Sequence, residues 1–277
     1  MRELTMRSGN RIPVLGQGTW GMGERRAERD TEIAALRHGL DLGLGLIDTA
    51  EMYGDGGAEE VIGAAIEGRR DEVFLVSKVF PHNAGERDAI AACERSLSRL
   101  GTDRIDLYLL HWRGNVPFAE TLEAFTRLRA EGKIRDFGVS NLDAGDLAEF
   151  WAQDGGDEIG TDQVLYNLSR RGPEFDLLPW CREHGVPVMA YSPIEQGRLL
   201  GSAVLSRVAG RHGVTPAQLA VAWVLHQPGV CAIPKAANPA HVAENAAALD
   251  LELTPDDLAE LDAEFPPPSA PVPLEIL

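Results

Sequence analysis

Eight short apolar segments recur along the chain, each followed by a longer segment with helical spacing, and this alternation limits the possible folds more than any other feature. The segments cover residues 14–19, 45–49, 73–79, 105–111, 136–140, 163–167, 187–192 and 230–234. Repeated βα units build parallel sheets, because each crossover returns the chain to the same edge. Eight such units can close into an α/β fold of the (β/α)8 TIM barrel class, and we predict this fold. A doubly wound open sheet is the competing arrangement.

Between the apolar segments lie amphipathic stretches whose apolar residues are spaced near the helical period, at residues 31–42, 87–100, 118–131 and 216–226. Thr215 followed by Pro216 predicts an N-cap with proline in the first turn. Gly101 and Gly132 stand where a glycine commonly follows a helix end. No linker-like break divides the sequence. We therefore predict a single barrel domain over residues 1–277, with a short proline-rich surface tail from about residue 265.

The length and charge of the chain exclude several classes of protein. A single barrel of this type takes roughly 250 residues, close to the 277 present. The formal net charge of −17 argues against nucleic-acid partners, which require a basic face. No run approaches the roughly 20 apolar residues of a membrane span, and the first residues lack the apolar stretch of a signal peptide. We expect a cytoplasmic protein that acts without a membrane.

Neither the cysteines nor the histidines suggest a metal site. Cys93, Cys181 and Cys231 are far apart and form no Cys-x-x-Cys pair, which argues against a disulfide framework or a zinc cluster and favours buried apolar positions. The seven histidines include no His-x-His or His-Glu-x-x-His pair. A metal-dependent barrel hydrolase using His111 and Asp48 is therefore a weak alternative, because ligands are scarce, and we expect no metal.

Polar residues stand at the C-terminal ends of most of the predicted strands. They are Asp48, Lys78, His111, Ser140, Asn141, the stretch from Gln163 to Asn167, Tyr191 and Ser192. In a barrel these ends meet on one rim, where the following loops surround a single pocket. One polar strand end is usually the chain emerging into water, but several on one rim indicate a functional site. We expect the site at this rim.

Several motifs resemble the signature of the aldo-keto reductase family. Residues 48–54 read Asp-Thr-Ala-Glu-Met-Tyr-Gly, Lys78 stands near a strand end, and His111 is followed by Trp112. Matching segments also lie at 16–20, 138–141, 190–193, 233–235 and 244–245, so the resemblance spans nearly the whole chain. It implies an NAD(P)H-dependent oxidoreductase that reduces the carbonyl of a small aldehyde or ketone to an alcohol.

The resemblance implies a catalytic tetrad of Asp48, Tyr53, Lys78 and His111. Reducing a carbonyl requires a hydride at carbon and a proton at oxygen, but a free tyrosine hydroxyl with a pKa of about 10 is a reluctant donor at neutral pH. The Lys78 ammonium is expected to lower the pKa of Tyr53, while Asp48 holds that lysine. A neutral His111 is expected to hydrogen-bond the substrate oxygen and orient it.

The cofactor site implied by the resemblance lies within the barrel. No Gly-x-Gly-x-x-Gly motif follows a strand and opens a helix, so a Rossmann domain is unsupported. Ser140, Asn141 and Gln163 match residues that hold the nicotinamide carboxamide, whose polar, uncharged edge suits amides and hydroxyls. Tyr191 matches a residue that stacks on the nicotinamide ring. The other implied contacts are Gly18, Thr19, Trp20, Asp48, Ser192, Glu244 and Asn245, the last two at the adenine.

The adenosine end departs from the family pattern. Members that prefer NADPH often carry Pro-Lys-Ser and, a few residues later, an arginine, whereas this chain has Ala236 and His241 at those positions. Lys235 remains as a point charge for a 2′-phosphate, but a mostly neutral imidazole replaces a bidentate guanidinium. We expect NADPH to be preferred, with NADH as the alternative.

An aromatic substrate pocket is expected from Trp20, Tyr53, His111 and Trp112, and it suits apolar or aromatic carbonyl compounds. The segment after Phe265 is short, so the loop that narrows the pocket in some relatives is expected to be abbreviated. We therefore expect an open, permissive site in a monomer whose partner is a small molecule.

Two further interpretations stay open. Arg170 and Arg171 could attract an acidic substrate, although a surface arginine pair is the favoured reading. The chain could also be a nicotinamide-binding regulatory subunit, because some relatives couple a bound cofactor to a partner protein. Turnover of a carbonyl substrate distinguishes an enzyme from such a subunit.

Overall fold

A computed structural model describes residues 2–277 and contains an eight-stranded parallel barrel. Its strands are β3 (Gly16–Gly18), β4 (Leu46–Asp48), β5 (Phe74–Val79), β6 (Ile105–Leu110), β7 (Ile134–Ser140), β8 (Asp162–Leu165), β9 (Val188–Tyr191) and β10 (Val230–Ala232). Each pairs in parallel with its neighbour in chain order. Parallel bridges from Leu15 to Ala232 and from Gly18 to Lys235 close the ring. The barrel prediction is confirmed, and the open sheet is excluded.

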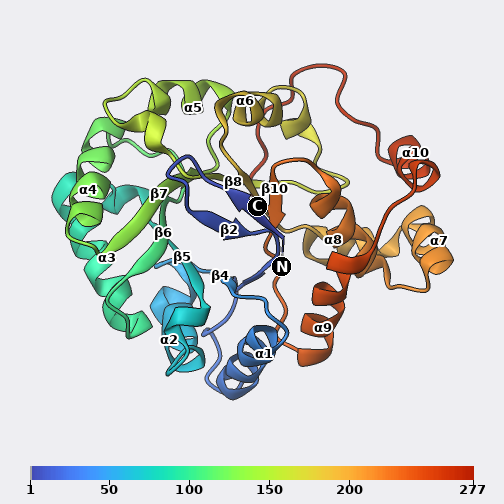
Figure 1. Ribbon diagram of the computed structural model, residues 1–277, viewed down its shortest axis with the longest axis horizontal. Coiled ribbons are helices and arrows are strands. Elements are labelled where there is room, and N and C mark those ends of the chain that lie inside the picture. Colours follow the sequence, from blue (N-terminus) through green and yellow to red (C-terminus); the bar gives the residue numbers. More distant parts are fainter. Residues whose placement is uncertain (1) are drawn as a thin grey trace.

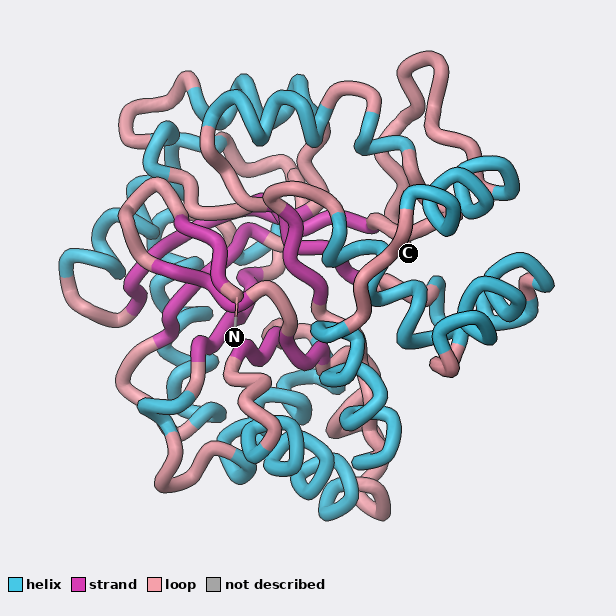
Figure 2. The backbone as a smooth tube through the Cα atoms, turned by 45° about the vertical axis from the view of Figure 1, so that its right-hand side comes forward, coloured by secondary structure: helices cyan, strands magenta, loops and turns pink. Residues whose placement is uncertain are grey.

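Ten α-helices of the described residues surround this ring of strands (Figures 1 and 2). They are α1 (Arg29–Asp41), α2 (Gly57–Ala65), α3 (Glu86–Leu100), α4 (Phe118–Ala130), α5 (Ala144–Trp151), α6 (Leu177–His184), α7 (Ala203–His212), α8 (Pro216–His226), α9 (Pro239–Ala247) and α10 (Pro255–Glu264). Short 3-10 helices cover Tyr53–Gly56, Arg70–Glu72, Pro81–Asn83, Gly156–Glu158, Gly172–Glu174, Glu195–Gly201 and Ala248–Asp250. Within residues 2–277, no helix combines the length and apolar character that crossing a bilayer requires.

The helix boundaries follow the signals in the sequence. Thr215 caps α8 in a reciprocal capping box, with its hydroxyl accepting from the Gln218 amide at 3.2 Å and its own amide donating to the Gln218 side chain at 2.9 Å. Gly101 follows α3 with a φ of 62°, and Gly132 lies just beyond α4 with a φ of 74°. A side chain at either position would be strained in this left-handed conformation.

The core lies inside the ring and between the ring and its helices, and all six residues of β6 are buried. Cys93, Cys181 and Cys231 belong to this core and are free thiols, as the sequence predicts. Burial raises the pKa of Cys93 and of Cys231 to about 12 and raises that of Cys181 further. The three thiols therefore stay protonated at neutral pH.

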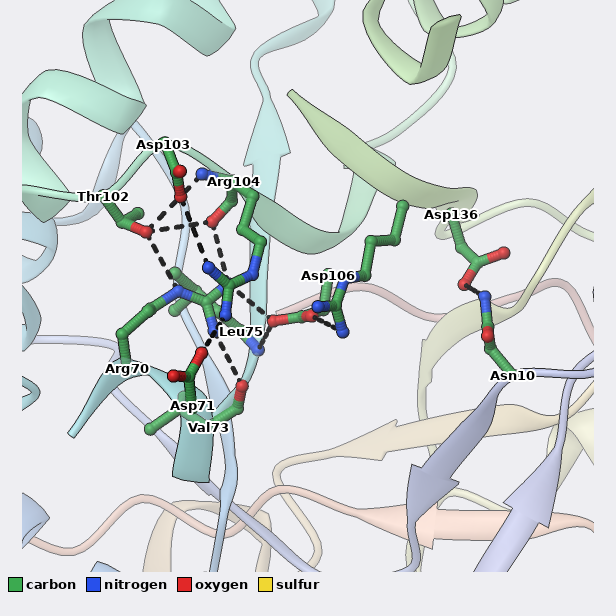
Figure 3. Close-up of polar contacts among 11 residues, drawn as sticks. Asn10, Arg70, Asp71, Val73, Leu75, Thr102, Asp103, Arg104, Asp106 and Asp136 are labelled. Atoms are coloured by element: carbon green, nitrogen blue, oxygen red, sulfur yellow. Dashed lines mark hydrogen bonds and ion pairs between the residues drawn. The ribbon is translucent and has the colours of Figure 1, made fainter. Parts of the chain in front are cut away.

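A hairpin of β1 (Glu3–Thr5) and β2 (Arg11–Pro13) covers the N-terminal end of the barrel and was not expected from the sequence. Asn10 lies in the loop between these two strands, and its side-chain amide donates to Asp136 Oδ2, near the start of β7, at 2.8 Å (Figure 3). Ile12 is fully buried beneath the hairpin. Strands of three residues are too short for an alternating pattern to reveal them.

Charged side chains tie neighbouring strands together at this same end of the barrel (Figure 3). Asp106, at the start of β6, is 2% exposed and pairs with Arg70 at 2.7 Å and with Arg135 at 3.0 Å. It also accepts from the backbone amide of Leu75, at the start of β5, at 2.9 Å. The N-terminal end is thus occupied by structural contacts, which leaves the opposite rim free for a site.

Candidate active site

A cavity of about 890 Å³ opens at the C-terminal ends of the strands, on the rim that the sequence predicts. Trp20, Tyr53, His111 and Trp112, the four expected substrate-pocket residues, all line it. It is also lined by Gly18, Thr19, Gly21, Glu24, Arg25, Asp48, Met52, Ser140, Asn141, Gln163, Tyr191, Ser192, Pro193, Ile194, Gln196, Gly197, Ile233, Lys235, Ile276 and Leu277. Residues separated by most of the chain length therefore face one space.

Lys78 lies at the base of this site, with its ammonium group fully buried. Its Nζ donates to Asp48 Oδ2 at 2.8 Å, to the Thr49 carbonyl oxygen at 2.7 Å and to the Tyr53 hydroxyl at 3.3 Å. A buried ammonium is costly unless its donors are satisfied, and three acceptors satisfy this one. Burial alone would lower the pKa of Lys78, but Asp48 and Tyr53 outweigh it and raise the pKa, so the group stays charged.

Tyr53 is held above Lys78 by a tight turn. Gly54 and Asp55 follow it with φ values of 58° and 54°, both in the left-handed region. A Cβ on Gly54 would also lie 2.9 Å from the Met22 carbonyl oxygen, so this position requires glycine. The turn therefore follows from the Tyr-Gly-Asp-Gly sequence and directs the tyrosine into the cavity.

Lys78 lowers the pKa of Tyr53, as expected from the sequence, but the net pKa is raised. Burial is the largest influence and raises the pKa of Tyr53 above 10, while the nearby ammonium opposes this rise without reversing it. The hydroxyl therefore keeps its proton at neutral pH. What Lys78 provides is a positive charge 3.3 Å from the oxygen, which favours the phenolate that remains after a proton has left.

His111 directly follows β6, and its ring meets the Tyr53 ring edge to face with centroids 5.7 Å apart. Burial, together with the Lys78 charge, lowers the pKa of His111 to about 2. The imidazole is therefore neutral at physiological pH, as expected from the sequence. Its Nδ1 is buried and has no hydrogen-bond partner among residues 2–277.

A chain of hydrogen bonds joins the polar strand ends on the opposite wall. Ser140 Oγ donates to the Gln163 carbonyl oxygen at 2.8 Å, and the Gln163 amide donates to Asp48 Oδ1 at 2.7 Å. Tyr191 donates to Asn141 Oδ1 at 3.0 Å. Asn141 has a φ of 58°, a left-handed conformation that asparagine tolerates better than most residues. Asp48 therefore holds Lys78 with one oxygen and Gln163 with the other.

One of the expected adenosine contacts, Lys235, lines this cavity and bridges to Gly18. The other four, Ala236, His241, Glu244 and Asn245, are not part of the lining and follow Lys235 along the chain, the last three within α9. Asn238 caps α9 by accepting from the Ala240 amide at 2.8 Å. The structure thus brings together the catalytic and nicotinamide candidates, while the adenosine candidates form a separate group.

A family model described as "Aldo/keto reductase family" matches residues 14–264, about nine-tenths of the chain. The chain belongs to the aldo/keto reductase family. It is 55% identical over 271 residues to methylglyoxal reductase YeaE of Escherichia coli, covering 96% of this chain and 95% of that protein. It is 34% identical to a glyoxal reductase of Bacillus subtilis, covering 93% and 91%.

Solved structures agree with this membership. An aldo/keto reductase from Klebsiella pneumoniae, crystallised in complex with NADP and acetate, superposes with a TM-score of 0.97 at 52% sequence identity. The match covers 99% of each chain. The aldo/keto reductase fold that the motifs imply is therefore shown over the full barrel.

The C-terminal segment of this aldo/keto reductase adds two residues to the cavity. The segment after Phe265 folds back so that Ile276 and Leu277 line it. They are 56% and 50% exposed. The proline-rich stretch before them, predicted as a surface tail, carries no pattern that reports where its last residues lie. Sequence reasoning therefore missed these two.

Proposed function

We propose that this aldo/keto reductase reduces small 2-oxoaldehydes such as methylglyoxal, with NADPH as the hydride donor. The contact between Lys78 and Tyr53 at the base of the cavity carries the proposal, because it pairs a protonated hydroxyl with a buried positive charge. The substrate class follows from the two relatives named methylglyoxal reductase and glyoxal reductase. The cofactor follows from the NADP complex of the Klebsiella pneumoniae enzyme.

In this mechanism Tyr53 gives its proton to the carbonyl oxygen while a hydride adds to the carbonyl carbon, so that C=O becomes CH–OH. A bound NADPH would supply the hydride. Tyr53 keeps its proton until the substrate oxygen becomes basic, and Lys78 then stabilises the phenolate. Asp48 keeps the ammonium in place and balances its charge.

His111 would orient the substrate. A neutral imidazole next to the Tyr53 ring can hydrogen-bond the carbonyl oxygen without competing for its proton. Trp20 and Trp112 line the same space and give it an aromatic wall.

The residues around the cavity fit a nicotinamide. A carboxamide offers both a donor and an acceptor, and Ser140, Asn141 and Gln163 present hydroxyl and amide groups on one wall. Tyr191 has its hydroxyl fixed by Asn141, which leaves its ring for stacking. Lys235, together with Ala236 and His241 farther along, would hold the 2′-phosphate, and Glu244 and Asn245 the adenine.

We further propose that the enzyme acts in the cytoplasm and as a monomer. One chain supplies every residue in the proposal, which supports the monomer. The tetrad and the cavity lining come from the described residues of a single barrel. Sedimentation of the purified protein measures the assembly state, and a stable dimer would contradict the monomer.

The test of the proposed function is NADPH oxidation by the purified chain with methylglyoxal. The Tyr53→Phe variant should lower kcat by about 10²- to 10⁴-fold, the scale of a positioned proton transfer, with NADPH affinity nearly unchanged. Near-normal turnover in this variant would contradict the assigned donor. NADPH binding without any carbonyl turnover in the wild type would instead favour the regulatory-subunit interpretation.

A further inference from the structure

Arg170 and Arg171, the pair considered as a site for acidic substrates, are both bound by carboxylates of the chain itself. Arg171 pairs with Glu174 at 2.7 Å and with Asp262 at 2.6 Å. Arg170 pairs with Glu195 and with Glu275. Neither guanidinium is therefore free to attract a ligand, and the function of Arg170 has to be sought in what its two partners hold.

Glu195 belongs to a strained turn on the cofactor side of the cavity. Ser192, Glu195 and Gln196 have φ values of 49°, 51° and 53°, in the left-handed region that side chains rarely adopt. Ser192, Ile194 and Gln196 line the cavity. A turn with this much strain keeps its shape only if surrounding contacts hold it.

Three side chains donate to the Glu195 carboxylate, which is 3% exposed. Arg170 donates to Oε1 through Nε at 3.0 Å and through Nη2 at 2.9 Å, and Arg198 donates to the same oxygen at 3.0 Å. Asn167 donates to Oε2 at 2.7 Å. The contacts of Asn167 and Arg170 fix the strained turn to the loop that follows β8.

Glu275 belongs to the C-terminal segment on the substrate side. Arg170 reaches it through the remaining nitrogen, Nη1. The next two residues, Ile276 and Leu277, line the cavity, and the backbone of Leu277 faces the Tyr191 hydroxyl. Large apolar side chains that are half exposed need an anchor to stay in one position, and the Glu275 ion pair is adjacent to both.

We propose that Arg170 is a positioning residue that clasps two walls of the active site, the 192–197 turn beside the cofactor and the 272–277 segment beside the substrate. Through the second wall, Ile276 and Leu277 limit the size of the carbonyl compound that reaches Tyr53. The planar guanidinium suits this role because its nitrogens point in fixed directions, with Nε and Nη2 on Glu195 and Nη1 on Glu275.

This inference rests on the proposed function for its substrate readout, so its test includes a second readout that needs no turnover. The first is the ratio of kcat/KM for a bulky aromatic aldehyde to kcat/KM for methylglyoxal. The second is the rate of NADPH release from the full-length protein, followed by tryptophan fluorescence, with Trp20 and Trp112 as reporters in the cavity wall.

Glu275→Gln and Leu277→Ala should each raise the aldehyde ratio about threefold or more, with NADPH release within about twofold of the wild type, because only the substrate-side wall is loosened. Arg170→Met should raise both the ratio and the NADPH release rate about threefold or more, because both walls lose their anchor. Arg127→Gln, which removes an exposed ion pair with Glu131 on α4, is the matched control and should change neither.

An unchanged aldehyde ratio in both Glu275→Gln and Leu277→Ala would overturn the size limit. NADPH release at the wild-type rate in Arg170→Met would overturn the clasp, as would an equal loss for both aldehydes without faster release. If Arg170→Met fails to fold, Arg170→Lys is measured in its place and should raise both quantities by a smaller factor, because one ammonium replaces the forked guanidinium contacts. Failure of methylglyoxal turnover in the wild type would refute the proposed function, while NADPH release would still test the clasp.

Discussion

Lys78 is surrounded by groups that each have a separate effect on it. The Asp48 carboxylate accepts one hydrogen bond from its ammonium group and keeps that group charged. The Thr49 carbonyl oxygen accepts a second hydrogen bond, and the Tyr53 hydroxyl oxygen accepts a third. Because burial raises the pKa of Tyr53 more than the ammonium lowers it, the lysine is best understood as stabilising the state after proton transfer. At the scale of single residues, the site thus combines a protonated Tyr53 hydroxyl with the Lys78 charge, which stabilises the phenolate left after proton transfer.

The pH dependence of reduction follows from these pKa shifts. The pKa of His111 is lowered to about 2, so its ring stays neutral as the pH rises from 5 to 9, and Tyr53 stays protonated because its pKa is raised. We expect kcat/KM to be level from about pH 6 to pH 9 and to fall only above about pH 10, as the phenol deprotonates. An inflection at about pH 6.5 would show that His111 titrates, against the direction of its shift.

We expect cofactor preference to depend on Lys235, because it carries the charge proposed for the 2′-phosphate. Replacing Lys235 with methionine should weaken NADPH binding about tenfold or more, the scale of a lost charge-assisted hydrogen bond, and leave NADH binding within about twofold. Fluorescence titration with each cofactor measures this. If both cofactors weaken equally, Lys235 does not contact the 2′-phosphate.

The residues that the sequence identified are those whose position follows from a general rule. Asp48, Lys78 and His111 lie at or next to the C-terminal ends of strands, and these ends meet on one rim of a barrel. The bond from Gln163 to Asp48 joins positions 115 residues apart and depends on side-chain directions that no local pattern records. Leu277 escaped detection for a similar reason, since the path of an irregular segment is set by contacts such as the Glu275 ion pair.

Capping explains why the start of α8 could be predicted from Thr215 and Pro216. Thr254 and Asn238 stand before a proline in the same way, and all three residues accept a backbone amide at a helix start. The β1–β2 hairpin has no comparable signal, because its strands hold three residues each. At the scale of elements, predictability depends on local hydrogen bonds and segment length.

Removing the cap of α8 should have a measurable cost. Thr215→Ala loses the hydroxyl that accepts from the Gln218 amide and should lower the free energy of unfolding by about 1 kcal/mol, whereas Thr215→Ser should retain most of it. Urea denaturation of both variants measures the difference. Equal stability of the alanine and serine variants would mean that the capping box contributes nothing.

In the whole molecule, contacts that stabilise the fold and residues of the active site lie at opposite ends of the barrel. The N-terminal end holds the hairpin and the buried Asp106 ion pairs, while the C-terminal end holds the tetrad and the cavity. The alternating pattern of the sequence predicts the barrel and therefore this division. The segments that cover the two ends, the β1–β2 hairpin and the C-terminal residues, could not be predicted, because they are short or irregular.

Ile12→Ala tests this separation. The side chain is fully buried under the hairpin, and its truncation should lower the free energy of unfolding by about 2–5 kcal/mol. The kcat/KM for methylglyoxal should stay within about twofold at temperatures where the variant is folded, because the change lies at the far end of the barrel. A large loss of activity in the folded variant would show that the two ends are coupled.

The burial of the three thiols bears on how an enzyme of this kind would resist chemical modification by its own substrate. Dicarbonyl compounds are electrophiles that add to thiolates, so an enzyme that handles them faces chemical damage from the reactant itself. Cys93, Cys181 and Cys231 are inaccessible and stay in the unreactive thiol form, because their pKa values lie far above neutrality. The interior that folds the barrel also shields its most vulnerable nucleophiles from adduct formation.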